Sequence, residues 1–303
     1  MGKDRKKKKG NGAALFEEYY SELYQERWPT LKEALLAPKE HTLLINPYGD
    51  FKEEGLESFY GYDHLYKLKE EILREEANDE EKLPVYFLDG ASALAPLCLD
   101  VQTGDRVLDL CAAPGGKSLI LAYALKESGS LTANDKSENR RFRLHSVLKR
   151  SLPESFFQES VRVTGFDASA WCLHEKEAYN KILLDAPCSS ERHVLESPEH
   201  LKEWRIGRTK RLATLQWSML ASAWLVLETG GRLVYSTCSL SPLENDGVVK
   251  KLIKKFGESV EVLTPHFPSD LNCGEASEYG TLFLPDKGGM GPFYLSILHK
   301  KDS

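Results

Sequence analysis

The sequence predicts an α/β fold in which helices cover both faces of a mainly parallel sheet, preceded by a helical extension. Short β-rich runs alternate with helical stretches from about residue 86 onward. Before that point, apolar and aromatic residues recur at helical spacing. Of the 303 residues, 41% are hydrophobic and 28% are charged, a composition typical of a globular protein with a sizeable core.

Three segments are expected along the chain: a basic tail over 1–14, a helical extension over 15–85 and a larger domain over 86–303. The first ten residues carry a net charge of +5 although the whole chain carries −6, so a solvated, disordered tail precedes an acidic body. Within the extension, residues 15–36 predict one helix, or two that are broken near Pro29, and 63–82 predict another. No apolar run approaches the length needed to span a bilayer, so no membrane partner is expected.

The larger domain is predicted to alternate strand and helix as far as its last strand. The expected strands are, in chain order, RVLDL, LTAND, VRVTGFD, KILLDAP, GRLVYST and FYLSIL. The expected helices are SLILAYALKES, ENRRFRLHSVLKRS, LATLQWSMLASAWLVL and ENDGVVKKLIKKF. Because ligands of parallel sheets bind at the carboxyl ends of the strands, the residues that follow these runs are the candidates for a site.

The loop after the first of these strands, CAAPGGKS, has two interpretations. It ends in Gly-Lys-Ser, as does the loop that binds the phosphates of ATP and GTP in nucleotide hydrolases. That motif requires a glycine where Cys111 stands, and Pro114 lacks a backbone N–H where the phosphate cradle needs a donor. The alternative is a nucleoside-binding turn, in which Gly115 and Gly116 let a ligand approach closely. The nucleoside-binding turn is favoured.

Acidic residues at the next two strand ends favour an adenosine ligand. Asp135 follows the glycines by about 20 residues, where an acid accepts the ribose hydroxyls in folds of this type. Asp167 ends the third strand and is a candidate acceptor for the adenine amino group. Since the loop lacks a full dinucleotide fingerprint, S-adenosylmethionine (S-adenosyl-L-methionine) is preferred to NAD as the ligand.

Two cysteines follow the fourth and fifth strands. Cys188 lies in LLDAPCSS, shortly after Asp185, and Cys238 lies in YSTCSLSPLEN. Adjacent parallel strands should bring these two thiols together across the end of the sheet. The six cysteines show no metal-ligand spacing, so no metal is expected, and Cys98 and Cys172 fit buried, inert thiols.

Two thiols beside a carboxyl group suit the methylation of cytosine at carbon 5. Carbon 5 is too weak a nucleophile to accept a methyl group directly, but a thiolate that adds to carbon 6 turns the ring into an enamine whose carbon 5 can attack a sulfonium methyl group. An acid near N3 accommodates the charge that develops during the addition. A base then removes the proton from carbon 5, and the thiol is expelled. The attacking thiol must be activated by its surroundings, because an unperturbed cysteine is mostly protonated near neutral pH. The residues alone leave open which cysteine attacks.

Together, DLCAAPGGKS, AND, LLDAPCSS and YSTCSLSPLEN resemble the NOP/SUN family of RNA (cytosine-5) methyltransferases, over residues 86–303. The resemblance implies a Rossmann-like class I methyltransferase fold with a seven-stranded sheet, and S-adenosylmethionine as the methyl donor. It implies that Cys238 attacks the base, that Cys188 assists product release and that Asp185 contacts cytosine. The residues it assigns to the methyl donor are Cys111, Ala112, Ala113, Pro114, Gly115, Gly116, Lys117, Asp135, Arg140, Asp167 and Asp185.

Segments FEEYYSELYQERWPTLKEALL, VYFLDGASALAPL and PCSSERH resemble the short, mitochondrial-type branch of the family. VRVTGFD and FLPDKGGMGPFY are closer to its ribosomal-RNA member than to its tRNA member. The resemblance implies an RNA partner, rRNA being favoured over tRNA, and leaves room for a protein partner that delivers the RNA. It implies a mitochondrial location, although the lysine-rich start is a poor presequence, and a cytoplasmic location is the alternative.

The basic segment LKEWRIGRTKR is the candidate RNA-binding surface. It follows the Cys188 loop and leads into a long helix, where its cations would lie beside the proposed site and near RNA phosphates. Trp204 within it either packs or stacks on a base, and packing is favoured; His193 is expected to be structural. The candidate RNA contacts are Lys202, Arg205, Arg208, Lys210 and Arg211.

Three classes of function remain open. The first is an RNA cytosine-5 methyltransferase, and the second is a nucleotide hydrolase, which Cys111 and Pro114 disfavour. The third is a non-catalytic RNA-binding factor for ribosome assembly that keeps the fold. The combination of Asp185, Cys188 and Cys238 favours the enzyme over the assembly factor.

Overall fold

The computed structural model describes residues 11–39, 41–52, 54–68, 83–271 and 273–302. Most of the predicted basic tail lies outside these residues, but its last part does not. Helix α1 (Gly12–Tyr24) begins before the predicted boundary at residue 15, because the side chain of Asn11 accepts a hydrogen bond from the backbone N–H of Ala13 at 3.2 Å and caps the helix. Among the described residues, no helix combines the length and apolar character needed to cross a bilayer.

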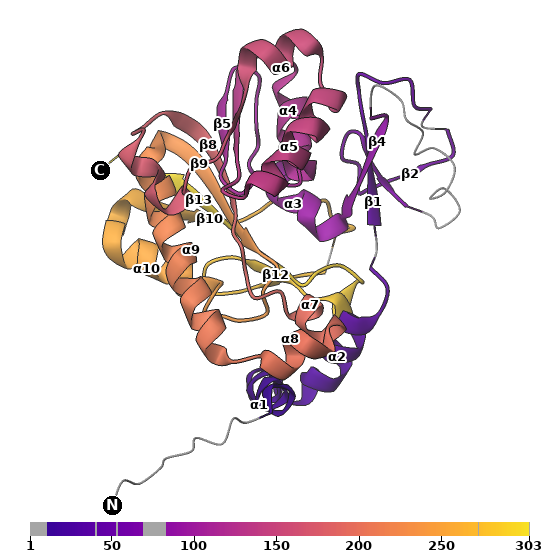
Figure 1. Cartoon of the computed structure of the whole chain (residues 1–303), viewed down its shortest axis with the longest axis vertical. Helices are drawn as coiled ribbons and strands as arrows, with labels where there is room; N and C mark the ends of the chain where they lie inside the picture. Colours follow the sequence, from indigo (N-terminus) through magenta and orange to yellow (C-terminus); the bar gives the residue numbers. More distant parts are fainter. Residues whose placement is uncertain (1–10, 40, 53, 69–82, 272, 303) are drawn as a thin grey trace, which may run out of the picture.

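The first part of the extension consists of two helices, as one of the two predicted alternatives has it. A short 3₁₀ turn, η1 (Gln25–Arg27), separates α1 from α2 (Trp28–Leu36). Pro29 lies in the first turn of α2, where its missing N–H removes no helical hydrogen bond. The two helices bury Phe16, Tyr20 and Trp28 against residues of the larger domain, and Figure 1 shows them packed beside α7 (Glu191–Glu196) and α8 (Pro198–Glu203).

The rest of the extension is a small antiparallel sheet, which the sequence did not predict. Its strands are β1 (His41–Ile45), β2 (Glu57–Ser58), β3 (Leu65–Lys67) and β4 (Val85–Asp89), in the order β2-β3-β1-β4. The helix predicted over 63–82 is therefore wrong at β3, and 69–82 lie outside the described residues. The domain boundary between residues 85 and 86 stays a prediction. Strand β4, which begins at Val85, pairs with β1, so the small sheet continues to Asp89, past that boundary.

Among the described residues, the larger domain is built on a sheet of nine strands where seven were expected. Five are parallel, in the order β7-β6-β5-β8-β9, and β13 is antiparallel to β9. β10 pairs with the outer edge of β13, and a β11–β12 hairpin on the same edge supplies the two additional strands. The strands are β5 (Arg106–Asp109), β6 (Ser130–Asn134), β7 (Val161–Thr164), β8 (Tyr179–Asp185), β9 (Leu227–Thr237), β10 (Val260–Leu263), β11 (Gly274–Ala276), β12 (Thr281–Phe283) and β13 (Phe293–Lys300).

Helices cover both faces of this sheet, as predicted. Successive residues of β8 point to opposite faces, so Leu183 packs in one core cluster while Ile182 and Leu184 pack in the other. Figure 1 shows β5, β8 and β9 between the two helical layers. One layer holds α3 (Gly90–Cys98), α4 (Gly116–Leu125), α5 (Glu138–Ser151) and α6 (Glu154–Ser160), and the other holds η3 (Ala168–Leu173), α9 (Ile206–Val226) and α10 (Asp246–Phe256).

Candidate active site

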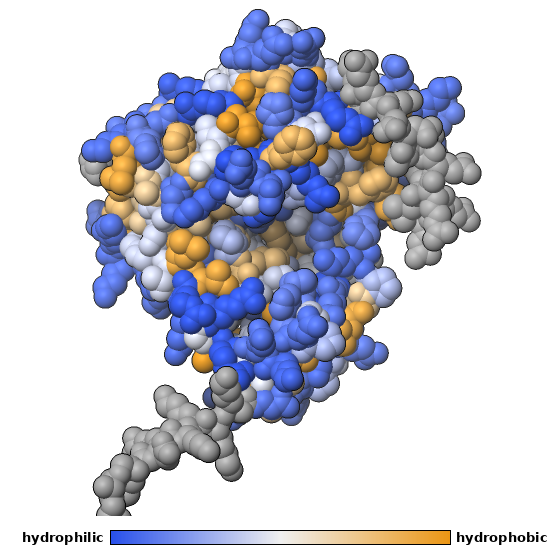
Figure 2. All heavy atoms as spheres, viewed as in Figure 1, coloured by the Kyte–Doolittle hydropathy of each residue, from blue (hydrophilic) through white to orange (hydrophobic). Residues whose placement is uncertain are grey.

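A cavity of about 560 Å³ lies at the carboxyl ends of β5, β6, β8 and β9. Figure 2 shows this face of the molecule hollowed near its middle, and Figure 1 places α5 and α9 around that region. Parallel strands end at the same edge of the sheet, so loops distant in sequence converge there. The lining residues are Leu110, Cys111, Ala113, Asn134, Asp135, Lys136, Ser137, Arg140, Phe166, Ala168, Asp185, Ala186, Pro187, Cys188, Ser190, Leu215, Met219 and Cys238.

The CAAPGGKS loop forms the tight turn from β5 into α4. Gly115 has φ +124°, a conformation that other residues rarely adopt, and a Cβ there would lie 2.9 Å from Cγ1 of Val147. A Cβ on Gly116 would lie 2.5 Å from the ring of Tyr86 in β4, so the small sheet supports this turn. Of the loop residues assigned to the donor, Cys111 and Ala113 line the cavity. The others, which build the turn without lining it, are Ala112, Pro114, Gly115, Gly116 and Lys117.

Asp135 brings an acceptor to the cavity at the end of β6. Its Oδ1 accepts a hydrogen bond from the backbone N–H of Ser137 at 2.9 Å. Its buried Oδ2 lies 3.3 Å from a guanidinium nitrogen of Arg140 and accepts no hydrogen bond from the residues that the structure describes. The same guanidinium donates to the carbonyl of Ala113, so Arg140 joins the two loops. An unused buried acceptor that lines the cavity suits a ligand hydroxyl.

Asp167 lies beside the cavity without lining it. Lys136 donates to its Oδ2 at 2.6 Å, and this hydrogen bond lowers the pKa of Asp167 to about 2. The neighbouring Phe166, which is 43% exposed, lines the cavity instead. Sequence reasoning missed Phe166 and Asn134, whose amide holds the backbone of β5 and β7 ends together by donating to the carbonyls of Leu110 and Phe166. The sequence signal for Phe166 was an aromatic residue near the end of the predicted strand VRVTGFD, where ligands of such sheets bind.

Asp185 is held in place by two partners. Lys117 forms an ion pair with its Oδ2 at 2.9 Å, and the hydroxyl of Ser236 donates to its Oδ1 at 2.8 Å. Burial lowers the pKa of Lys117, but the pairing with Asp185 outweighs it and the pKa is raised overall. Lys117 therefore stays charged and fixes the carboxylate of Asp185 at the cavity wall.

The two strand-end cysteines meet, as the topology predicted. Sγ of Cys188 lies 2.8 Å from Sγ of Cys238, and both residues line the cavity. The hydrogen bond with Cys238 and burial raise the pKa of Cys188 well above its usual range. Cys188 is therefore a protonated thiol at neutral pH.

The basic segment runs from the end of α8 into the first turns of α9, next to the cavity. Lys202, Arg208, Lys210 and Arg211 are exposed, and Arg205 is half-buried with its guanidinium donating to the carbonyl of Trp204. Leu215 and Met219 of the same helix line the cavity, so about one helical turn separates Arg211 from the cavity wall.

Trp204 packs rather than facing solvent, which agrees with the favoured prediction. It is 4% exposed, and its ring lies 5.4 Å from that of Phe16 and 6.1 Å from that of Tyr20, measured between centroids. His193 is exposed on α7, with its ring 4.9 Å from that of His200.

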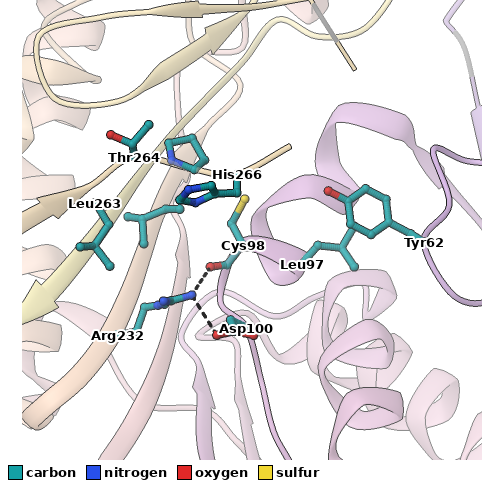
Figure 3. A pocket seen from close by; sticks show the side chains of 10 residues that line it. Tyr62, Leu97, Cys98, Asp100, Arg232, Leu263, Thr264 and His266 are labelled. Atoms are coloured by element: carbon teal, nitrogen blue, oxygen red, sulfur yellow. Dashed lines mark hydrogen bonds and ion pairs between the residues drawn. The ribbon is translucent and has the colours of Figure 1, made fainter. Parts of the chain in front are cut away.

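A second cavity, of about 530 Å³, opens beside α3 and contains none of the predicted site residues. Figure 3 shows Arg232 directed toward Asp100 and the carbonyl of Cys98. These contacts measure 3.3 and 3.4 Å, so the cation of this cavity is already paired within the chain. Burial raises the pKa of Cys98 to about 12, which makes it the inert thiol that the sequence predicted.

The sequence of this chain is similar to those of known RNA methyltransferases. The family model described as 16S rRNA methyltransferase RsmB/F matches residues 96–299. The 5-cytosine rRNA methyltransferase NSUN4 of Mus musculus is 32% identical over 336 residues, covering 94% of this chain and 87% of that protein. The mitochondrial tRNA (cytosine(34)-C(5))-methyltransferase of Danio rerio is 31% identical over 317 residues, covering 94% and 86%.

Solved structures agree with this fold. The crystal structure of a methyltransferase homolog protein from Pyrococcus horikoshii superposes with a TM-score of 0.72 at 25% sequence identity, covering 94% of each chain. The expected class I methyltransferase fold is confirmed by this similarity, and a nucleotide hydrolase finds no support in these comparisons.

Proposed function

Because the chain belongs to the RsmB/F family of methyltransferases, we propose that it methylates carbon 5 of a cytosine in RNA through a covalent adduct with Cys238. The observation that carries this proposal is the pairing of Cys188 and Cys238, 2.8 Å apart, beside Asp185 in one cavity. Two thiols and a carboxylate at the ends of adjacent strands are the groups that addition to the pyrimidine ring requires.

S-adenosylmethionine is the methyl donor, and the residues of the cavity fit it. The unused acceptor on Asp135 matches a ribose hydroxyl, and the exposed face of Phe166 matches an adenine ring. When bound, the donor supplies a sulfonium methyl group to carbon 5. The remaining roles fall to the protein, whose Arg140 and Gly115 hold the loops that face the donor.

Cys238 is the proposed nucleophile. Its thiolate forms a carbon–sulfur bond at carbon 6, which places electron density on carbon 5 for methyl transfer. Asp185 is the proposed contact of the pyrimidine ring during this addition, and its ion pair with Lys117 supports that role. A base then takes the proton from carbon 5, and the electrons of that carbon–hydrogen bond re-form the ring double bond and expel the sulfur of Cys238 as a thiolate. Cys188, whose pKa is raised, remains a thiol that stands beside the leaving sulfur and assists its release.

The test uses Cys188→Ala, which should accumulate the protein–RNA adduct because release is impaired. The full chain is incubated with S-adenosylmethionine and with separate rRNA and tRNA pools, and a nuclease-sensitive band is sought on denaturing gels. The adduct should disappear in Cys188→Ala/Cys238→Ala and should not form in Cys98→Ala, a matched control for an inert thiol. Full methylation by Cys238→Ala would refute the mechanism.

Ribosomal RNA is the proposed substrate, supported by the names of the family model and of the mouse relative. A tRNA is the alternative, since the zebrafish relative is named for one. A protein partner that delivers the RNA belongs to the same proposal. Sequencing the trapped RNA decides between rRNA and tRNA, and adduct formation by purified protein alone would argue against a required partner.

RNA is proposed to approach along α9. The exposed Lys202, Arg208, Lys210 and Arg211 lead toward Leu215 at the cavity wall, so phosphates held there would place an unstacked cytosine over the thiols. We also propose a mitochondrial location, which the name of the zebrafish relative supports. Fractionation of cells that express the full chain tests this, and recovery from the cytosol would favour the alternative location.

A further inference from the structure

Two glutamates are completely buried directly behind the paired cysteines. Glu191 is the first residue of α7, and Glu244 precedes α10; both have no exposed surface. Buried carboxyl groups are costly unless they are hydrogen-bonded, and two negative charges at such a place would repel each other strongly. Neither glutamate lines the cavity, so the methylation chemistry leaves both without a role.

A chain of hydroxyl groups joins the two glutamates through the residues that follow the cysteines. Ser189 follows Cys188, Ser239 follows Cys238, and their Oγ atoms lie 3.0 Å apart. Oγ of Ser189 donates to Oε1 of Glu191, and Oγ of Ser239 lies 3.2 Å from Oε1 of Glu244. The contact between the two sulfurs is thus repeated one residue later by a contact between two hydroxyls.

A proton on one carboxyl group would supply the hydrogen that this chain lacks. Three links connect Glu244, Ser239, Ser189 and Glu191 in sequence, but the two serines supply only two hydroxyl hydrogens. A third hydrogen completes the chain if a carboxyl group donates at one end. A longer contact of 3.4 Å, between Oγ of Ser239 and Oε1 of Glu191, adds no hydrogen to this set.

The surroundings identify Glu244 as the protonated end. Glu191 accepts hydrogen bonds at both oxygens, from the hydroxyl of Tyr20 at 2.6 Å and from the backbone N–H of Leu240 at 2.8 Å, so both of its oxygens already serve as acceptors. Oε2 of Glu244 accepts from the backbone N–H of Ser189 and from the amide of Gln216, so Oε1, 3.2 Å from Oγ of Ser239, is the oxygen on which a proton would complete the chain.

Electrostatics agree with this assignment. Burial raises the pKa of Glu244 first, and the nearby charge of Glu191 raises it further. The other titratable groups that contact this network are Tyr20, whose hydroxyl reaches Glu191, and Tyr235, whose hydroxyl donates to the backbone carbonyl of Glu244. Burial raises the pKa of both tyrosines well above the usual range, so both remain neutral donors.

We propose that Glu191 and Glu244 share a single proton and act as positioning residues that hold the two Cys-Ser segments in register. The chain runs from the neutral Glu244 through Ser239 and Ser189 to the charged Glu191, and Tyr20 of α1 ties the N-terminal helices to it. The amide of Gln216 adds a second tie, because it also donates to the carbonyl of Pro187 just before Cys188. The shared proton is argued without the proposed function; only the catalytic value of holding Cys188 and Cys238 in place rests on it.

The experiment measures that register without RNA. Diamide, a thiol oxidant, converts Cys188 and Cys238 of the full chain to a disulfide at a rate that depends on how closely the sulfurs are held, and peptide mass spectrometry follows the product. Glu244→Gln replaces a neutral donor by a neutral donor and should leave the rate within about twofold of wild type. Glu244→Ala and Glu191→Gln should slow it by about tenfold or more, since each breaks the chain and leaves buried partners unsatisfied.

The two glutamates must respond differently for the proposal to hold. A rate for Glu244→Gln as low as that for Glu244→Ala would overturn it, as would a wild-type rate in Glu191→Gln. If Glu191→Gln does not fold, Ser189→Ala takes its place, with the same slowing expected and an unchanged rate counting against the proposal. Binding of S-adenosylmethionine, measured by calorimetry, should persist in every folded variant because the lining of the donor cavity is untouched.

Methylation assays then separate this proposal from the proposed function. With an RNA that the wild type methylates, Glu244→Gln should restore most of the kcat that Glu244→Ala loses. If the wild type methylates no RNA, the proposed function fails, and the disulfide rates still decide whether the shared proton positions the cysteines.

Discussion

Asp109 offers a quantitative test of the electrostatics beneath the donor loop. It is 1% exposed, its Oδ2 accepts a hydrogen bond from Ser118 at 2.7 Å, and its buried Oδ1 accepts none. Burial raises the pKa of Asp109 from 3.8 to about 7, and the nearby charge of Asp185 adds to the effect. The folded protein thus holds a proton on this carboxyl group that the unfolded chain releases near pH 4.

The sign and size of the resulting pH dependence follow from linkage. Because the folded state binds the proton more tightly, this contribution to stability is complete below the unfolded pKa and is lost as the pH rises through about 7. The difference between an unfolded pKa of 3.8 and a folded pKa of about 7 corresponds to ~4 kcal/mol in total, of which ~2 kcal/mol is lost between about pH 5.5 and about pH 8. Asp109→Asn keeps the side chain neutral at every pH and lacks this loss.

Urea unfolding at these two pH values, in the wild type and in Asp109→Asn, measures the effect. The free energy of unfolding of the variant, minus that of the wild type, should increase by ~2 kcal/mol from the lower to the higher pH. Ser118→Ala removes a hydrogen bond that favours the charged form of Asp109, so its own loss of stability should extend to higher pH. A difference between wild type and Asp109→Asn that does not change with pH would refute a neutral Asp109.

Three further variants test other parts of the structure. Gly115→Ala forces a Cβ into a backbone with φ +124° and to 2.9 Å from Val147. We expect it to destabilise the fold by ~2–4 kcal/mol and to abolish S-adenosylmethionine binding, measured by calorimetry. An unchanged melting temperature would contradict the strain assigned to this turn. Trp204→Ala should cost ~3–5 kcal/mol in urea unfolding, because the ring is buried; a loss of RNA affinity without a loss of stability would mean that it stacks on a base instead. Replacing Arg208 and Arg211 by Ala should reduce the slope of log binding constant against log salt by about 1.4 on single-stranded RNA, and an unchanged slope would place the RNA elsewhere.

Most of the site was predictable because it is built from strand ends. In an α/β sheet the order of strands and helices along the chain places the carboxyl ends together, so Asp135, Asp185, Cys188 and Cys238 could be assigned to one cavity without coordinates. Asp167 was placed correctly at a strand end, but its pairing with Lys136 and the exposure of Phe166 depend on side-chain directions that the pattern does not contain.

The small N-terminal sheet was not predictable in the same way. Its strands β2 and β3 are two and three residues long, too short to show an alternating pattern, and they exist because they pair with β1 and with each other. The residues after Asp63 have helical spacing, yet at Leu65–Lys67 tertiary pairing overrides that preference. The start of α1 depended on a single cap, the side chain of Asn11.

By itself, the sequence determined the fold class, the methyl donor and the two thiols of the site, because these depend on local motifs and on the fixed geometry of parallel strands. Only the tertiary structure decided what stands behind those thiols. Glu191, Glu244 and Tyr20 are far apart in the chain, and whether a carboxyl group is charged or shares a proton depends on burial and on the donors around it. Such energies arise from contacts across the fold, which no spacing of residues along the chain specifies.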